Sequence, residues 1–166
     1  MINRNIAEQP TENYSLRRRV WRYGPLVLWM VFISFASTSE FSAVNTSKII
    51  RPLLLWLFPN LSEERLAVIH FLARKAAHFT EYAVLGLLAY RALSASSRAF
   101  LRRSWFWMGT LLIVVYALLD EYHQSFVPSR TASIYDSLID VVGGFTALII
   151  FAIWSDRGRQ KGAHLR

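Results

Sequence analysis

Long uncharged apolar stretches, separated by short blocks of charge, constrain this chain more than any other feature of its sequence. Hydrophobic residues make up 54% of the 166 residues and charged residues only 18%, and the charges gather at the ends of the apolar stretches. A soluble domain spreads its charges along the chain, whereas a helix that crosses a bilayer needs roughly 17 to 25 mostly apolar residues in succession. The sequence therefore predicts an all-α integral membrane protein without a separate soluble domain.

Four stretches have the length and apolarity of transmembrane helices. We expect these helices over residues 23–37, 76–93, 104–119 and 137–154. They form a single transmembrane domain over residues 23–154, between basic tails at residues 1–22 and 155–166, and residues 1–16 read as a flexible part of the first tail.

The connection between the first and second helices contains a further apolar segment, residues 49–59. It is too short to span and carries Pro52 and Pro59, so we expect it to lie in the interface or to enter the membrane and return. Ser62, followed by two glutamates, has the pattern of a helix start. The second helix is therefore expected to be one long rod whose first turns lie outside the hydrocarbon.

The net charge of +8 is explained by the position of the basic residues beside the apolar stretches. Such residues set orientation and contact anionic lipid headgroups, so we expect membrane lipids and no nucleic acid as partners. The connection between the second and third helices has four basic residues, whereas the one between the third and fourth has only Arg130. Because cytoplasmic connections carry the excess of Lys and Arg, both termini are predicted to be cytoplasmic.

Ionisable side chains lie near the outer end of the predicted helices. At a rise of 1.5 Å per residue, His78 lies about 4.5 Å and Glu81 about 9 Å below Lys75, and Asp140 lies about 6 Å below Asp136 on the fourth helix. A charged side chain in lipid costs about 2.5 to 3.5 kcal/mol, so these groups should face one another or a wet cavity. The pattern predicts a polar pocket that opens to the extracytoplasmic side.

The expected pocket joins groups from three helices and one loop. We assign acid-base chemistry to Lys75, His78, Glu81, Asp120 and Glu121, and ligand binding to Gln124, Arg130, Asp136 and Asp140. In a purely structural interpretation the same groups form ion pairs, such as Lys75 with Glu81 and Arg130 with Asp136. Gly143 and Gly144 are expected to allow close helix approach. One histidine without a second spaced ligand motif leaves metal and cofactor unassigned.

Two segments that contain these residues resemble a known protein family. Residues 74–86, Arg-Lys-Ala-Ala-His-Phe-Thr-Glu-Tyr-Ala-Val-Leu-Gly, and residues 120–130, Asp-Glu-Tyr-His-Gln-Ser-Phe-Val-Pro-Ser-Arg, resemble the VanZ-like family of bacterial membrane proteins. The resemblance covers roughly residues 70–150 and implies a small multi-pass protein of the bacterial cytoplasmic membrane. The naming member is linked to glycopeptide resistance, chiefly to teicoplanin. Two departures concern ligand preference: Ser129 stands where glycine is frequent, and Asp140 where asparagine is common.

The functional expectation is a pocket that binds or modifies a cell-envelope component. A lipid-linked cell-wall intermediate or a polar lipid headgroup would be held through its anionic part by Lys75 and Arg130. Glu81, Asp120 or Glu121 would act as base through His78. Two alternatives remain: a non-enzymatic accessory or binding protein, and a cation or proton pathway. The absence of an internal repeat disfavours the pathway, and neither turnover nor oligomeric state follows from the sequence.

Overall fold

A computed structural model describes residues 9–38, 43–128 and 133–163, and all regular structure in these ranges is α-helical. The helices are α1 (Gln9–Ala36), α2 (Ala43–Leu57), α3 (Glu63–Ser94), α4 (Ala99–Arg103), α5 (Trp105–Gln124) and α6 (Ile134–Ala163). The all-α prediction is confirmed. The long rod is confirmed as α3, and Ser62 caps it by accepting a hydrogen bond from the Arg65 amide at 3.4 Å.

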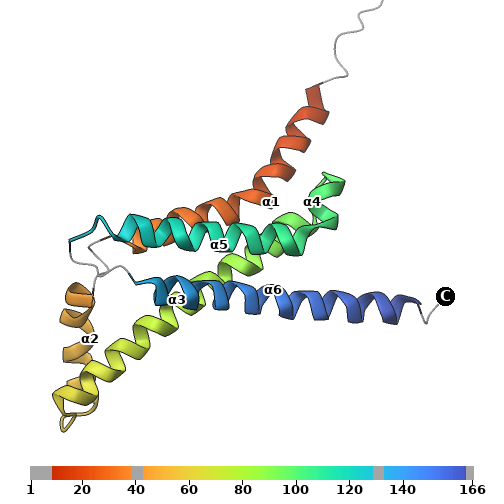
Figure 1. The fold of residues 1–166 in the computed structure, drawn as a ribbon. Coiled ribbons are helices and arrows are strands. Elements are labelled where there is room, and N and C mark those ends of the chain that lie inside the picture. The colour runs from red at the N-terminus through yellow and green to blue at the C-terminus, as the bar shows by residue number, and fades with distance from the viewer. Residues whose placement is uncertain (1–8, 39–42, 129–132, 164–166) are drawn as a thin grey trace, which may run out of the picture.

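Helix α3 is the centre of the arrangement, and the other five described helices all pack against it. Figure 1 shows α5 and α6 running along one another while α3 crosses them obliquely, with α2 standing beside the first turns of α3. The buried apolar core follows the inner side of α3, at Tyr82, Leu85 and Ala89, and is completed by Ile113 of α5 and Leu148 of α6.

One expectation about the first half of the chain is wrong in its described part. The segment 1–16, expected to be flexible, is helical from Gln9 onward, with Pro10 in the first turn, where its missing N–H is not needed; residues 1–8 lie outside the described residues. Most of the apolar segment 49–59 belongs to a longer helix, α2, that passes through Pro52 and ends at Leu57, before Pro59, and its expected place in the membrane interface stays a prediction. The basic connection after α3 also contains a short helix, α4, that the sequence pattern did not predict.

Glycines bring α3 and α6 into backbone contact, as Gly143 and Gly144 predicted. A Cβ on Gly143 would overlap the carbonyl oxygen of Phe79, and a Cβ on Gly86 would lie 2.5 Å from the carbonyl oxygen of Gly144. The same Cβ on Gly144 would lie 2.8 Å from Ile113. Because the obstacles at Gly143 and Gly86 are backbone atoms, only glycine permits this separation of the two helices.

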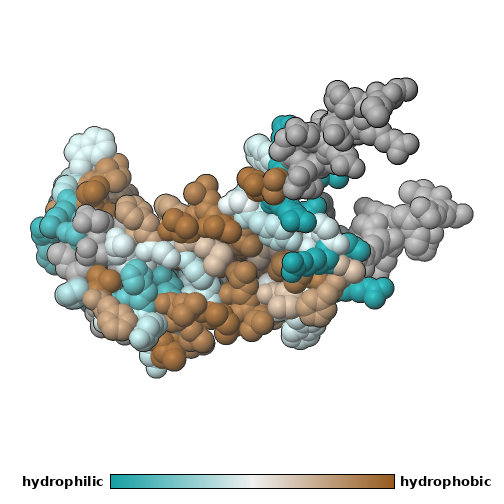
Figure 2. All heavy atoms as spheres, turned by 90° about the horizontal axis from the view of Figure 1, so that it is seen from above, coloured by the Kyte–Doolittle hydropathy of each residue, from teal (hydrophilic) through white to brown (hydrophobic). Residues whose placement is uncertain are grey.

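Apolar side chains also cover much of the outer surface. Figure 2 shows hydrophobic residues over the middle of one face and hydrophilic residues gathered toward its ends. By length and composition, Trp105–Gln124 and Ile134–Asp156 could each cross a membrane, with mean hydropathies of 1.2 and 2.0, and only 22% and 33% of these windows are buried. Helices α1 and α3 carry charges along their length, such as Arg22 and Glu81, so four spanning helices remain a sequence-based expectation.

Candidate functional site

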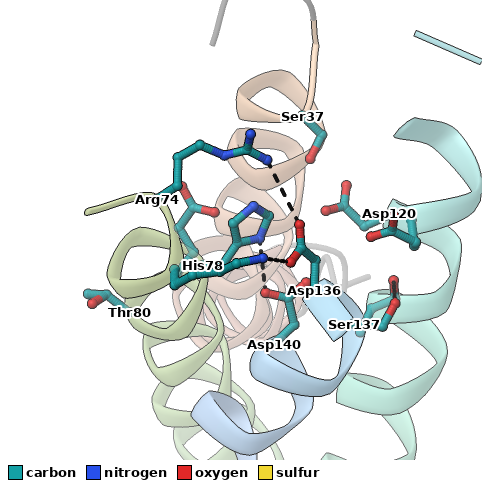
Figure 3. Close-up of polar contacts among 12 residues, drawn as sticks. Ser37, Arg74, His78, Thr80, Asp120, Asp136, Ser137 and Asp140 are labelled. Atoms are coloured by element: carbon teal, nitrogen blue, oxygen red, sulfur yellow. Dashed lines mark hydrogen bonds and ion pairs between the residues drawn. The ribbon is translucent and has the colours of Figure 1, made fainter. Parts of the chain in front are cut away.

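The charged groups of α3 and α6 meet just beyond the glycine contact. Lys75 forms an ion pair with Asp136, and the guanidinium of Arg74 lies 3.8 Å from the other carboxylate oxygen of Asp136 (Figure 3). Asp136 is buried, whereas the two basic side chains keep part of their surface exposed. The carboxylate is therefore neutralised within the fold, by groups from the neighbouring helix.

One turn further along both helices, His78 meets Asp140. The Nδ1 atom of His78 lies 3.1 Å from a carboxylate oxygen of Asp140, and both side chains are buried (Figure 3). An ionised carboxylate only accepts hydrogen bonds, so with Asp140 ionised Nδ1 donates, and when the ring is neutral Nε2 is its basic nitrogen. Nε2 has no hydrogen-bond partner among the described residues. A carboxylate that orients imidazole in this way is a common device for general acid-base chemistry.

A second polar group joins α5 to the end of α1. The Gln124 side-chain amide donates to Asp120 at 3.1 Å and to the hydroxyl of Ser37 at 3.2 Å. Glu121 accepts a hydrogen bond from the Ser133 amide through one oxygen, and its other oxygen is buried without a partner in the described part of the chain. These contacts join the C-terminal ends of α1 and α5 to the start of α6, beside the ion pairs of α3 and α6.

A pocket of about 270 Å³ reaches His78 from the side of α1 and α2. Its polar lining comes from the residues Ser37, Thr46, His70, Arg74, His78 and Glu81. A neighbouring pocket of about 380 Å³ between α2 and α3 shares His70 and Arg74 with it. The 270 Å³ pocket is thus lined by one guanidinium and two imidazoles, with Glu81 as its acidic residue.

Comparison with models of known protein families identifies the family. The sequence profile of the VanZ/LLP1 family matches residues 21–155, which is most of the chain. The chain belongs to the VanZ/LLP1 family. No curated protein and no solved structure matches it. The resemblance seen over residues 70–150 is therefore confirmed and extends to α1, at whose C-terminal end Ser37 meets the family motif of α5.

The VanZ-type motifs are brought together in two groups. The first contains Lys75, His78, Asp136 and Asp140; the second contains Asp120 and Gln124, with Glu121 beside it. The Glu81 side chain lines the pocket, and its backbone carbonyl accepts a hydrogen bond from the Trp29 indole at 2.8 Å. Arg130 lies outside the described residues.

The partners differ from those considered in the sequence. Lys75 pairs with Asp136 of α6 instead of Glu81, and the carboxylate on His78 is Asp140 instead of Glu81, Asp120 or Glu121. Sequence reasoning gave no role to Ser37, although it ends the first apolar stretch on the side where Gln124 is expected. Among the residues that the structure describes, no three His, Cys, Asp or Glu residues are placed to hold a metal ion.

Proposed function

We propose that this VanZ-family chain spans the bacterial cytoplasmic membrane four times, through α1, α3, α5 and α6, with both termini in the cytoplasm. The low burial of the apolar windows in α5 and α6 supports a lipid setting, since the core helix of a soluble protein hides most of its surface. The distribution of Lys and Arg supports the orientation. The pocket beside His78 then opens to the extracytoplasmic side.

In this setting the pocket binds the anionic headgroup of a cell-envelope component, such as a lipid-linked cell-wall intermediate or a polar lipid. The observation that carries this proposal is the buried pair of His78 and Asp140, which leaves Nε2 of the histidine as a base at a pocket that Arg74 also lines. A guanidinium binds phosphate and carboxylate groups through two parallel hydrogen bonds. Arg74 therefore holds the anionic part of the ligand, while Lys75 keeps Asp136 neutralised.

The chemistry that this arrangement supports is proton transfer to or from the bound headgroup. His78 takes the proton on Nε2, and Asp140 stabilises the imidazolium that results. Glu81 lines the same pocket and contributes a second carboxylate toward the ligand. A modifying reaction would use both groups, and a binding protein would use them only for recognition. A link to teicoplanin-type resistance is part of the proposal, through the envelope component that is bound.

One observation favours the accessory alternative. Asp136 and Asp140 are both paired with basic groups of α3, so these two carboxylates need no ligand and their pairs can fix the bundle alone. A cation or proton pathway is favoured less, because a pathway must continue through the bundle and the described core beyond His78 is apolar, at Leu85 and Ala89.

The decisive experiment compares the lipid and cell-wall precursor profile, and teicoplanin susceptibility, of a deletion strain carrying wild-type or variant protein. We expect one precursor or lipid to accumulate in the deletion strain. Glu81→Gln and Asp140→Asn should fail to correct it at normal membrane level, because both isosteres keep shape and remove the charge. Glu64→Gln, an exposed carboxylate at the start of the same helix, is the matched control and should restore the wild-type profile.

Two results would reject the envelope-ligand function. A flat profile in the deletion strain favours the accessory alternative. Full correction by both Glu81→Gln and Asp140→Asn shows that the pocket carboxylates serve no ligand.

A further inference from the structure

A third pocket, of about 670 Å³, lies at the C-terminal end of α3. It is lined by Arg17, Arg18, Trp21, Arg22, Arg91 and Ala95. Four of these six residues are arginines and none is acidic, so the cleft is strongly positive. We call it the arginine cleft. It joins the N-terminal half of α1 to the last turns of α3, two segments about seventy residues apart in sequence.

The arginine cleft is held in place by hydrogen bonds between these helices. Pro25 lies inside α1 and has no N–H, so it cannot make the helical bond to the carbonyl of Trp21, four residues earlier. The guanidinium of Arg91 donates to that carbonyl at 3.0 Å. Arg22 donates to the Ser97 hydroxyl at 2.9 Å. Each of these guanidinium groups has five N–H donors, so most of them stay available to a ligand.

The charge of the arginine cleft selects an anion, and its geometry favours a phosphate ester. Guanidinium groups bind phosphate oxygens in a fork geometry that ammonium groups lack. The volume falls within the range of ordinary ligand pockets, about 300 to 1,000 Å³. Trp21 lines the cleft and is 64% exposed, and tryptophan prefers the headgroup level of a bilayer.

We propose that the arginine cleft binds the phosphate headgroup of an anionic phospholipid in the cytoplasmic leaflet. The site is separate from the proposed envelope pocket, since Arg91 is sixteen residues beyond Lys75 on α3, or about 24 Å along the helix. A lipid bound here bridges α1 and α3 and holds the start of α1 against the end of α3. A free phosphate is the competing source of the same chemistry, and the test separates the two.

The test uses the full chain purified in an uncharged detergent and titrated separately with dihexanoyl phosphatidylglycerol, dihexanoyl phosphatidylcholine and inorganic phosphate. We expect phosphatidylglycerol to bind at least 10-fold more tightly than either of the others. Arg17→Gln with Arg18→Gln should weaken that binding by roughly 30-fold, because each basic residue near anionic lipid contributes about fivefold. Both arginines are exposed and make no described hydrogen bond, so the fold should be retained.

The matched control is Arg19→Gln with Arg103→Gln, which removes the same charge from exposed positions outside the cleft. Its affinity for phosphatidylglycerol should change by less than 3-fold. The proposal is overturned if this control weakens binding as much as the cleft variant, since the basic surface as a whole is then responsible. It is also overturned if inorganic phosphate or phosphatidylcholine binds as tightly as phosphatidylglycerol.

Discussion

Gly143→Ala tests the contact on which the whole site depends. The new Cβ would overlap the carbonyl oxygen of Phe79, and the next two closest atoms are also backbone atoms of Phe79. A side chain could rotate away, but a helical backbone can give way only if α6 moves away from α3. That movement would separate His78 from Asp140, which lie directly beside the contact.

The expected cost follows from two opposing effects. Overpacking of a tight interior costs typically 1 to 3 kcal/mol, and a backbone obstacle places Gly143→Ala at about 3 kcal/mol. Alanine in place of glycine within a helix stabilises the folded state by about 1 kcal/mol, because alanine has the higher helix propensity. The free energy of unfolding should therefore fall by about 2 kcal/mol, which lowers the melting temperature of a chain of this size by roughly 4 to 8 °C.

The assay is thermal unfolding in detergent, followed by the fluorescence of the six tryptophans at one fixed heating rate. Gly24→Ala is the matched control, because Gly24 is also helical and its added Cβ would meet only Val20 at 3.8 Å, an ordinary contact. It should melt at or slightly above the wild-type temperature. Gly86→Ala disturbs the same contact from the side of α3, where the new Cβ would meet the Gly144 carbonyl. Its melting temperature should fall as it does for Gly143→Ala.

The packing argument is refuted if Gly143→Ala and Gly86→Ala have the same melting temperature as Gly24→Ala. The two helices would then stand far enough apart to admit a methyl group, and the close approach that positions the site would not exist.

Lys75→Met should lower the amount of protein in the membrane and the free energy of unfolding by about 3 kcal/mol, since buried Asp136 then keeps only the more distant Arg74. Adding Asp136→Asn should restore the amount of protein, as measured by immunoblot. Tyr116→Phe removes hydrogen bonds from α5 to Ser34 and to the Met30 carbonyl of α1, and should lower the unfolding free energy by about 1 to 2 kcal/mol in the same melting assay. Because the chain has no cysteine, single cysteines introduced as Ser125→Cys or Ala99→Cys report the orientation of the protein in the membrane. In intact cells an impermeant thiol reagent should label the Ser125→Cys protein and not the Ala99→Cys protein. Equal or reversed labelling contradicts the proposed orientation.

The sequence predicted what depends on spacing within one helix. Ser62 marks the start of α3 because a hydroxyl and first-turn carboxylates satisfy free amides, a local effect. Asp136 and Asp140 share a face of α6 because they are four residues apart. The close approach at Gly143 followed from its missing side chain.

The choice of partners could not be predicted in the same way. Several acids were expected at about the depth of His78, and depth alone does not distinguish them. Asp140 is selected because the glycine contact fixes how α3 and α6 cross, and that crossing is a property of two helices about sixty residues apart. The role of Ser37 depends likewise on how α1 lies against α5. The pairing proposed for Arg130 remains a prediction, since that residue is outside the described part.

The order of synthesis gives the pairing of α3 with α6 a consequence for membrane insertion. Lys75 and His78 precede their partners by 61 and 62 residues, so α3 leaves the ribosome well before Asp136 and Asp140 exist. At about 5 to 20 residues per second, this interval lasts roughly 3 to 12 s. If α3 spans the membrane as proposed, an unpaired charge on it is unfavourable by about 2.5 to 3.5 kcal/mol, and we then expect the insertion machinery to shelter α3 until α6 arrives. A nascent chain that ends before α6 should accordingly leave α3 poorly integrated.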